Sequence, residues 1–384
     1  MKSNYRIGDL VERVDIRNTN GDINLLLGVS IDKCFIRSVA NTIGTDLSKY
    51  KVIRKDEFAV SLMQVSRDSR IPIACLMEYD EAIMSPAYSI FKVKDETIVL
   101  PDYLSMWFQR SEFDREATFI AVGGVRGSMP WEDFCRINVY VPSIERQKSI
   151  VSSYKAVENR IALKRKINDN LEATVRAIYK SVFVDFNPFG GIKPSEWEET
   201  TIDNIASEVI CGKTPPTSDP ENYGSFMPFI TIPDMHGSVY STPTERFLSE
   251  KGVATQESKT LPANSICVSC IASVGLVCLT AEPSQTNQQI NSIICKSGIS
   301  PYYVYIKMTT LSNYLKQLGA GGSTTLNVNK TLFGQIPVLC PDESTMTTFH
   351  NRVEPLFNEM RSNQFEMQNL ESLKSLVLSR LSSR

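Results

Sequence analysis

The chain has 384 residues, of which 42% are hydrophobic and 22% charged, and its formal net charge is −2. This composition excludes wholesale disorder, and the length favours two or three domains over a single core. No apolar run approaches the roughly 18 residues of a membrane span, and the polar start lacks the apolar stretch of a signal peptide. We therefore expect a cytoplasmic protein, and the net charge requires any nucleic-acid surface to be local.

Nine cysteines give an odd count and lack the two C-x-x-C pairs of a zinc ribbon, which argues against a disulfide framework and a structural metal. Cys267, Cys270 and Cys278 lie close together, but in an apolar, strand-like stretch without a neighbouring histidine. We interpret them as small core residues and predict no metal site.

Residues 1–143 are expected to form a first globular domain of mixed α/β type. Short apolar, β-branched runs such as residues 51–60 alternate there with turns rich in Gly, Pro and Ser.

Residues 144–186 are predicted to form one long coiled-coil helix. They contain no glycine, and seam positions recur at alternating steps of four and three, which is the heptad pattern. The seam is Ile150, Tyr154, Val157, Ile161, Lys164, Asn168, Leu171, Val175, Ile178 and Val182. From Ile144 to Val182 there are nine basic and four acidic residues, an excess that fits a solvated face as well as a DNA-facing one.

A linker and a second globular domain follow. Two prolines and two glycines prevent a helix from continuing through residues 187–196, which we interpret as the linker. Residues 197–342 again mix short β-branched runs with turns, as in residues 265–270 and 290–295, and are expected to form a second mixed α/β domain.

The last segment, residues 343–384, repeats the helix. Its seam lies 199 residues after the first: Phe349, Val353, Leu356, Met360, Asn363, Met367, Leu370, Lys374, Val377 and Leu381. Residues 134–142 also align without gaps on residues 333–341, so the chain is an internal duplication with a pseudo-two-fold repeat. Pro355 is expected to start or kink the second helix, because proline cannot donate the i to i−4 hydrogen bond.

The contacts between the two helices can be derived if they pack antiparallel. If Ile150 lies beside Leu381, Asn168 falls beside Asn363, and these asparagines are predicted to meet. A buried polar residue in a coiled-coil seam costs stability but fixes register. The candidates for this role are Lys164, Asn168, Asn363 and Lys374.

Two globular domains, each followed by a long heptad helix, resemble the layout of the specificity subunits of type I restriction-modification systems. Short sequence motifs support the resemblance, most clearly in the second half of the chain. The similar segments are residues 178–188, Trp197, Gly212-Lys213-Thr214-Pro215, residues 261–266, Gly321-Gly322-Ser323-Thr324 and Ile336-Pro337-Val338. The first domain departs from the family pattern, because it has Gly123-Gly124-Val125-Arg126-Gly127-Ser128 in place of the family's usual loop motif.

The resemblance implies a non-catalytic subunit without a cofactor of its own. Each globular domain would be a target-recognition domain that reads one half of a split double-stranded DNA target, and the helices would set the spacing. The implied partners are two modification subunits, which bind S-adenosylmethionine and methylate adenine, and restriction subunits that carry the motor and nuclease.

Candidate DNA contacts are hydrogen-bond donors in glycine-flanked loops, because Arg can fork to guanine or phosphate and Gln or Asn can pair with adenine. In the first domain they are Gln64, Arg67, Arg70 and Arg126. In the second they are Lys213, Thr214, Asn287, Gln288, Gln289, Ser323 and Thr324. The same residue types also stabilise turns or remain solvated.

Two alternative functions are open. Asp234 with Glu257 and Lys259 fits the loose spacing of a Mg²⁺-dependent nuclease, in which carboxylates hold the metal and the lysine supports the attacking water. A tandem adaptor that binds proteins could use the same duplication. A P-loop ATPase is excluded, because Ser207 stands where the motif of Gly212-Lys213 needs its first glycine.

Overall fold

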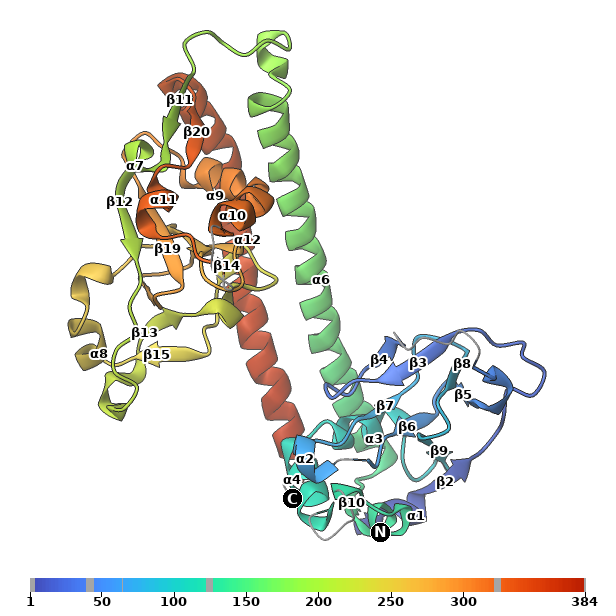
Figure 1. The fold of residues 1–384 in the computed structure, drawn as a ribbon. Coiled ribbons are helices and arrows are strands. Elements are labelled where there is room, and N and C mark those ends of the chain that lie inside the picture. The colour runs from blue at the N-terminus through green and yellow to red at the C-terminus, as the bar shows by residue number, and fades with distance from the viewer. Residues whose placement is uncertain (1–3, 39–44, 64, 122–126, 321–325, 383–384) are drawn as a thin grey trace. The chain divides into compact units, whose positions relative to one another are not determined.

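The computed structural model describes residues 4–38, 45–63, 65–121, 127–320 and 326–382, and the chain forms two compact units. Unit 1 is Met1–Asn159 with Ser372–Arg384, and unit 2 is Arg160–Glu371 (Figure 1). Within the described ranges, none of the helices combines the length and hydrophobicity that a membrane span requires.

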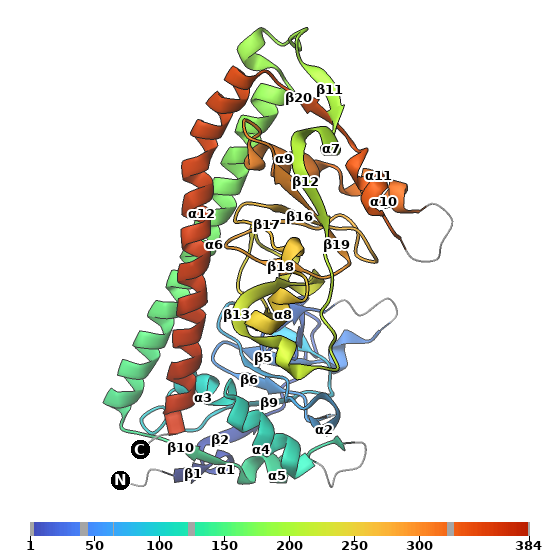
Figure 2. The same ribbon diagram turned by 90° about the vertical axis from the view of Figure 1, so that its left-hand side faces the viewer.

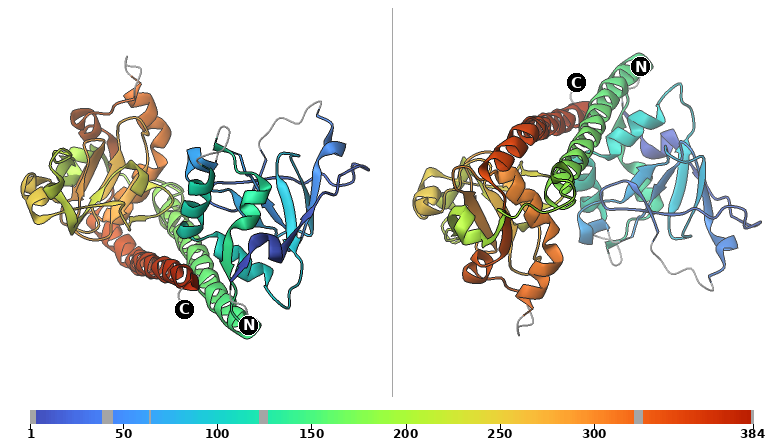
Figure 3. Two further views of the ribbon diagram at one scale, coloured as in Figure 1. Left: turned by 90° about the horizontal axis from the view of Figure 1, so that it is seen from below. Right: turned by 90° about the horizontal axis from the view of Figure 1, so that it is seen from above.

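Unit 1 contains two four-stranded sheets, with strand orders β2-β9-β6-β7 and β4-β3-β8-β5, and the antiparallel pair β1-β10. Its strands are β1 (Asn4–Arg6), β2 (Val11–Val14), β3 (Leu26–Val29), β4 (Phe35–Arg37), β5 (Lys51–Arg54), β6 (Phe58–Val60), β7 (Ile73–Cys75), β8 (Glu81–Met84), β9 (Ser89–Val93) and β10 (Asn138–Tyr140). Its short helices are α1 (Ile7–Leu10), η1 (Leu47–Lys49), α2 (Val65–Asp68), α3 (Pro101–Phe108), α4 (Ser111–Ala121) and α5 (Trp131–Arg136). Buried aromatic rings join sheet and helices in one core, as where Phe108 packs edge-on against Phe58. Figure 3 shows the ribbon from two further sides, with most strands of this unit in blue and cyan.

Unit 2 contains a five-stranded sheet, β12-β19-β16-β17-β14, a three-stranded sheet, β15-β13-β18, and the antiparallel pair β11-β20. Its strands are β11 (Glu198–Thr201), β12 (Ala206–Cys211), β13 (Tyr223–Ile230), β14 (Tyr240–Ser241), β15 (Arg246–Leu248), β16 (Ile266–Ser269), β17 (Val277–Thr280), β18 (Gln285–Thr286), β19 (Ile290–Cys295) and β20 (Pro337–Cys340). Its short helices are η3 (Asn187–Phe189), α7 (Ile202–Ile205), η4 (Pro220–Asn222), η5 (Ile232–Met235), α8 (Glu250–Ala254), η6 (Glu257–Lys259), α9 (Pro301–Thr310), α10 (Ser312–Gly319) and α11 (Lys330–Gly334).

The two units share one strand topology. The order β2-β9-β6-β7 corresponds to β12-β19-β16-β17, and β4-β3-β8 corresponds to β15-β13-β18. Even the parallel pairing of β3 with β8 recurs between β13 and β18. Strand β5 extends one sheet of unit 1 and β14 extends one sheet of unit 2. The duplication predicted from the ends of the domains therefore runs through their sheets as well.

Individual hydrogen bonds repeat too. The hydroxyl of Tyr103 donates to the carbonyl of Tyr140 at 2.9 Å, and the hydroxyl of Tyr303 donates to the carbonyl of Leu339 at 2.5 Å. Both tyrosines lie in the helix that begins at a proline, and both acceptors lie in the strand that precedes a long helix. Each bond ties the last strand of its unit to the core.

The long helices are α6 (Ile144–Phe183) and α12 (Glu343–Ser379), the latter followed by the short helix η7 (Arg380–Ser382) (Figure 2). They pair antiparallel within each unit, as Glu158 with Lys374 shows in unit 1 and Arg160 with Glu366 in unit 2. Because α12 begins at Glu343, Pro355 does not start this helix but lies inside it.

Each unit contains the beginning of the helix that follows its own sheets and the end of the other helix. Leu381 of η7 is buried in the core of unit 1. Val175, Tyr179 and Phe183 at the end of α6 are buried in the core of unit 2. The expected linker packs on unit 2, where Phe189 meets the ring of Trp197 edge-on. The helices are thus integral parts of both cores.

Candidate nucleic-acid interface

Four connections meet at one end of the sheets of unit 2, and we call them its loop edge. They are residues 212–219 after β12, residues 287–289 before β19, residues 270–276 between β16 and β17, and residues 326–329 before α11. Backbone hydrogen bonds link them in a row. Cys270 donates to Gln289, and Val328 donates to Cys270. The second domain's candidate loops, 75 residues apart in sequence, are therefore neighbours in space.

Gly212 lies at the closest approach of two of these loops. Its N–H donates to the carbonyl of Ile290, and the next N–H, of Lys213, donates to the carbonyl of Thr286. A Cβ at position 212 would overlap the carbonyl oxygen of Asn287 and the hydroxyl of Thr286. Glycine is therefore the residue that lets the loops meet, and this explains the motif without a P-loop.

The candidate side chains of unit 2 divide into two kinds. Asn287 is buried, and it donates to the side chain of Gln289 and accepts from the backbone of Gln289. Thr214 donates to Gln288 across the two loops at 2.6 Å. Lys213 and Gln288 themselves are exposed. Asn287, Gln289 and Thr214 therefore hold the loops in shape. Lys213 and Gln288 are exposed to a ligand, although the side-chain oxygen of Gln288 already accepts from Thr214. The predicted residues Ser323 and Thr324 lie outside the described residues.

Unit 1 has the same loop edge. It comprises residues 15–25 after β2, residues 85–88 before β9, residues 61–72 between β6 and β7, and residues 127–130 before α5. Here Met129 donates to the carbonyl of Leu62, as Val328 does to Cys270 in unit 2. Of the predicted residues, Arg67 has its backbone in α2, on this edge. Gln64 and Arg126 lie outside the described residues.

Arg70, the remaining predicted contact of unit 1, is paired with Asp32 at 3.2 Å. Beside it lies Lys33, which the sequence analysis did not single out, and which forms a buried ion pair with Asp114 at 2.8 Å. Burial lowers the pKa of Lys33, although the hydrogen bond to Asp114 opposes this shift. Arg70 therefore belongs to a charged cluster within unit 1, and it is exposed at the surface.

The polar seam residues of the helices form one network in unit 2. Asn363, only 1% exposed, donates to Asn168 at 2.9 Å and accepts from Lys164 at 2.6 Å. Asn168 also donates to the carbonyl of Met360, and Lys164 pairs with Glu366 at 2.9 Å. The predicted contact between Asn168 and Asn363 is thus present, and these buried groups have partners, as burial demands.

Lys374, the fourth polar seam residue, lies in unit 1. It pairs with Glu158 at 2.9 Å, and its ammonium group lies over the ring of Tyr154 at 5.4 Å. Charge and cation–π contact together keep this lysine at the helix contact.

The basic excess of α6 is largely neutralised within the chain. Six of its nine basic residues form ion pairs with acidic residues of the same unit: Lys155, Arg160, Lys164, Arg165, Arg176 and Lys180. This pairing favours a solvated face over a DNA-facing one.

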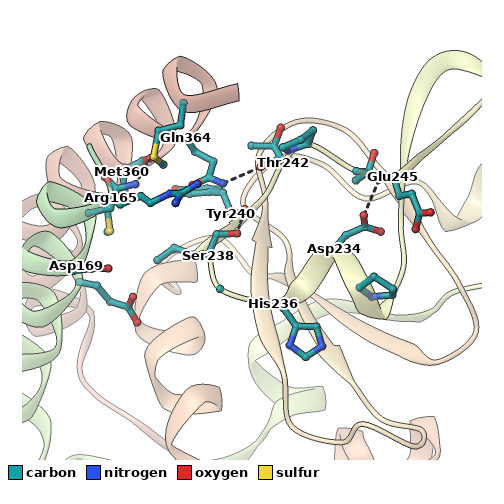
Figure 4. A pocket seen from close by; sticks show the side chains of 18 residues that line it. Arg165, Asp169, Asp234, His236, Ser238, Tyr240, Thr242, Glu245, Met360 and Gln364 are labelled. Carbon is teal, nitrogen blue, oxygen red and sulfur yellow. Dashed lines mark hydrogen bonds between the residues drawn. The ribbon is translucent and has the colours of Figure 1, made fainter. Parts of the chain in front are cut away.

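The proposed nuclease residues do not form a metal site. Asp234 accepts hydrogen bonds from the backbone and hydroxyl of Thr231 and from the backbone of Glu245, and so closes a turn (Figure 4). Glu257 and Lys259 lie in the separate helix η6. In the part of the chain that the structure describes, no three His, Cys, Asp or Glu residues gather as metal ligands. The cysteine trio is buried, with Cys267 opposite Cys278 across β16 and β17.

Comparison with known proteins identifies similar chains. A family model described as the type I restriction modification DNA specificity domain matches residues 194–363. The HindI specificity subunit of a type I restriction enzyme from Haemophilus influenzae is 30% identical, over 79% of this chain and 81% of that protein. The MjaIX specificity subunit from Methanocaldococcus jannaschii is 32% identical over 38% of this chain and 35% of its own. The crystal structure of a type I system S subunit from M. genitalium shares the fold with a TM-score of 0.61 at 12% identity, covering 98% of this chain and 95% of that one.

Proposed function

This chain belongs to the specificity subunits of type I restriction-modification systems, and we propose that each of its two units reads one half of a bipartite DNA target through its loop edge. As a specificity subunit it is not an enzyme. It supplies DNA sequence specificity to a complex whose chemistry resides in other subunits. We assign DNA reading to the loops because the same loop edge recurs on the same strand topology in both units.

A loop edge suits this task because loops on a rigid scaffold can change their side chains without changing the fold. In unit 2 the scaffold is a five-stranded sheet, and the loops are tied together by backbone hydrogen bonds. The exposed Lys213 and Gln288 are then the residues we assign to DNA, the lysine to a phosphate and the glutamine to a base edge. The supporting residues are Thr214, Asn287 and Gln289, and Ser323 and Thr324 are proposed contacts from the neighbouring loop.

In unit 1 the proposed contacts are those of the sequence analysis: Gln64, Arg67, Arg70 and Arg126. They fall on the connection between β6 and β7 and on the loop before α5, which are the counterparts of residues 270–276 and 320–329. Arg70 pairs with Asp32 through one of its nitrogens, and a guanidinium has five N–H donors in all.

For the helices we propose that the network of Lys164, Asn168 and Asn363, together with Lys374, fixes the register of the coiled coil. The proposed domain boundaries follow the sequence: recognition domains at 1–143 and 197–342, helices at 144–186 and 343–384, and the linker at 187–196. Ends of α6 and α12 at nearby residues support these boundaries.

The partners of the chain are DNA and the methyltransferase and restriction subunits of its complex. More specifically, we propose two modification subunits, which bind S-adenosylmethionine and methylate adenine, and restriction subunits that join them for cleavage. The duplication of the chain supports two modification subunits, because two equivalent surfaces can each bind one copy. We also propose that the complex acts in the cytoplasm.

The test is reconstitution. The chain is purified together with the modification subunit encoded beside it, and transfer of methyl groups to adenine is measured on DNA libraries of random sequence. We expect methylation at one sequence motif, and no transfer when either subunit is alone. Methylation without sequence preference would refute the proposal.

The same preparation separates the alternatives. A nuclease would cut plasmid DNA when the chain and Mg²⁺ are mixed without partners. An adaptor for proteins would give a complex whose DNA affinity does not depend on this chain or on salt.

A further inference from the structure

The shared topology assigns residues of the matching strands of units 1 and 2 to one another, and the correspondence leads from these strands to Arg17 and Lys213. Leu62 and Cys270 correspond because each accepts the N–H that leads into the next helix, from Met129 and Val328. Four residues earlier, Phe58 and Ile266 occupy the same place in β6 and β16.

The strand pairings carry the correspondence onward. Phe58 faces Phe91, which faces Arg13, and Ile266 faces Ile293, which faces Val209. Arg13 of β2 therefore corresponds to Val209 of β12. Four residues further along the chain lie Arg17 and Lys213.

A second set of pairings gives the same result. Leu26 pairs with Ile83 in unit 1, and Phe229 pairs with Gln285 in unit 2, in both cases in parallel strands. From Ile83 to Phe91 and from Gln285 to Ile293 there are eight residues each. The segments that lead from β8 to β9 and from β18 to β19 therefore keep the same register in the two units.

Both counterparts are cations on the loop edge of their unit. Lys213 is exposed, and the side chain of Arg17 is 36% exposed. The guanidinium of Arg17 donates to the carbonyl of Lys49 at 2.8 Å and pairs with Asp15 at 2.9 Å. A guanidinium has five N–H donors, so these contacts fix its position without using all of its donors. Asp15 and Lys49 thus hold a cation in place at the surface.

We propose that Arg17 is a DNA-contact residue of unit 1 and that it binds a backbone phosphate, as Lys213 does in unit 2. The two side chains share a positive charge and hydrogen-bond donors but not shape, because only arginine presents a planar fork. Charge is what phosphate recognition needs, whereas reading a base depends on shape. This inference rests on the proposed function and adds a residue that lies in none of the loops first predicted for unit 1.

The experiment measures DNA binding by the complex of this chain with its modification subunit. Dissociation constants for a duplex that contains the target are determined at several salt concentrations, for the wild type, Arg17→Ala and Lys213→Ala. One lost phosphate contact lowers the slope of log K against log salt by about 0.9, and we expect affinity to fall about fivefold to tenfold at moderate salt. Both variants are expected to prefer the same target sequence as the wild type.

Three further variants serve as controls. Arg17→Lys keeps the charge and is expected to bind within about twofold of the wild type, with its salt slope. Arg17→Met keeps the aliphatic stem but not the charge, so it is expected to fold and to show the loss of affinity and of salt slope predicted for Arg17→Ala. It keeps the test decisive if the alanine variant fails to fold. Lys55→Ala removes an equal charge from the exposed turn between β5 and β6, at the other end of β6. This variant is expected to change neither the DNA affinity nor the salt slope.

The outcomes are distinct. If Lys213→Ala weakens binding but Arg17→Ala and Arg17→Met do not, the inference about Arg17 is wrong and the proposed function stands. If Arg17→Ala changes the preferred bases, the contact is to a base and not to a phosphate. If the wild-type complex shows no preference for any sequence, the proposed function itself is wrong.

Discussion

At Gly212 the two loops of unit 2 approach so closely that only glycine, which has no side chain, fits between them. Any Cβ there overlaps backbone and side-chain atoms of the facing loop. We expect Gly212→Ala to push the loops apart and to cost about 1–3 kcal/mol of stability, the range of overpacked sites. Thermal unfolding of the complex checks the stability, and the DNA affinity should fall as well because Lys213 is adjacent.

A matched control is Gly28→Ala in β3. Its Cβ would make only ordinary van der Waals contact with the hydroxyl of Tyr88, so we expect little change. Equal unfolding temperatures for wild type and Gly212→Ala would show that the loops do not meet as described.

Among individual residues, the sequence alone predicted more of the candidate site in unit 2 than in unit 1. Lys213 lies in a motif that resembles the family, Gln288 was predicted as a hydrogen-bonding side chain in a loop, and the two loops are neighbours in the structure. Arg17 escaped because its equivalence to Lys213 rests on strand pairings, which no alignment of the two halves at one fixed offset reveals. Lys33 escaped because nothing local in the sequence signals that Asp114 is its partner.

At the scale of the elements, the contact of Asn168 with Asn363 can be tested by a double-mutant cycle. Replacing Asn363 by Ala removes one hydrogen-bond partner from Lys164 and one from Asn168, and we expect a loss of about 1–3 kcal/mol. Because the two asparagines contact each other, the cycle with Asn168→Ala should show a coupling of at least about 0.5 kcal/mol. Additive effects in chemical denaturation would mean that the two side chains do not interact.

The same network predicts a dependence on pH. Hydrogen bonds from Arg160 and then Lys164 hold the pKa of Glu366 below its ordinary value of 4.5. A carboxyl group with a lowered folded-state pKa stabilises the fold above its unfolded pKa, and this stability is lost as pH falls through the folded value.

We therefore expect the wild type to lose stability more steeply below about pH 4.5 than Glu366→Gln, which cannot titrate. Unfolding of both proteins across this pH range makes the comparison, and other acidic residues cancel because both proteins share them. Parallel curves for the two proteins would contradict the ion pairs of Glu366.

Helices were the elements that sequence could predict best. Heptad spacing predicted both long helices and, on the condition that they pack antiparallel, their register, because the seam side chains of one helix contact those of the other. Pro355 was partly misjudged, since tertiary packing on both sides of it keeps α12 continuous. The strands were predicted only as short apolar runs, because their order depends on pairings between distant segments, and β5 and β14 differ between the halves.

For the molecule as a whole, one strand topology occurs twice, and we propose that each copy recognises DNA. Both units use the same strand order, the same tyrosine hydrogen bond and the same loop edge, while the side chains on those loops differ. A common scaffold with different loop residues is what two half-sites of different sequence require. Each unit should then be alterable without changing what the other reads.

The most direct test maps methylated adenines in DNA exposed to the complex, for the wild type and for Gln288→Ala. The wild type is expected to give a motif of two blocks with a fixed spacer. Loss of one base contact should relax one position of one block by about 1–3 kcal/mol, and leave the other block and the spacer unchanged. An undivided motif, or a variant that alters both blocks, would contradict the central claim that each unit reads its own half of the target.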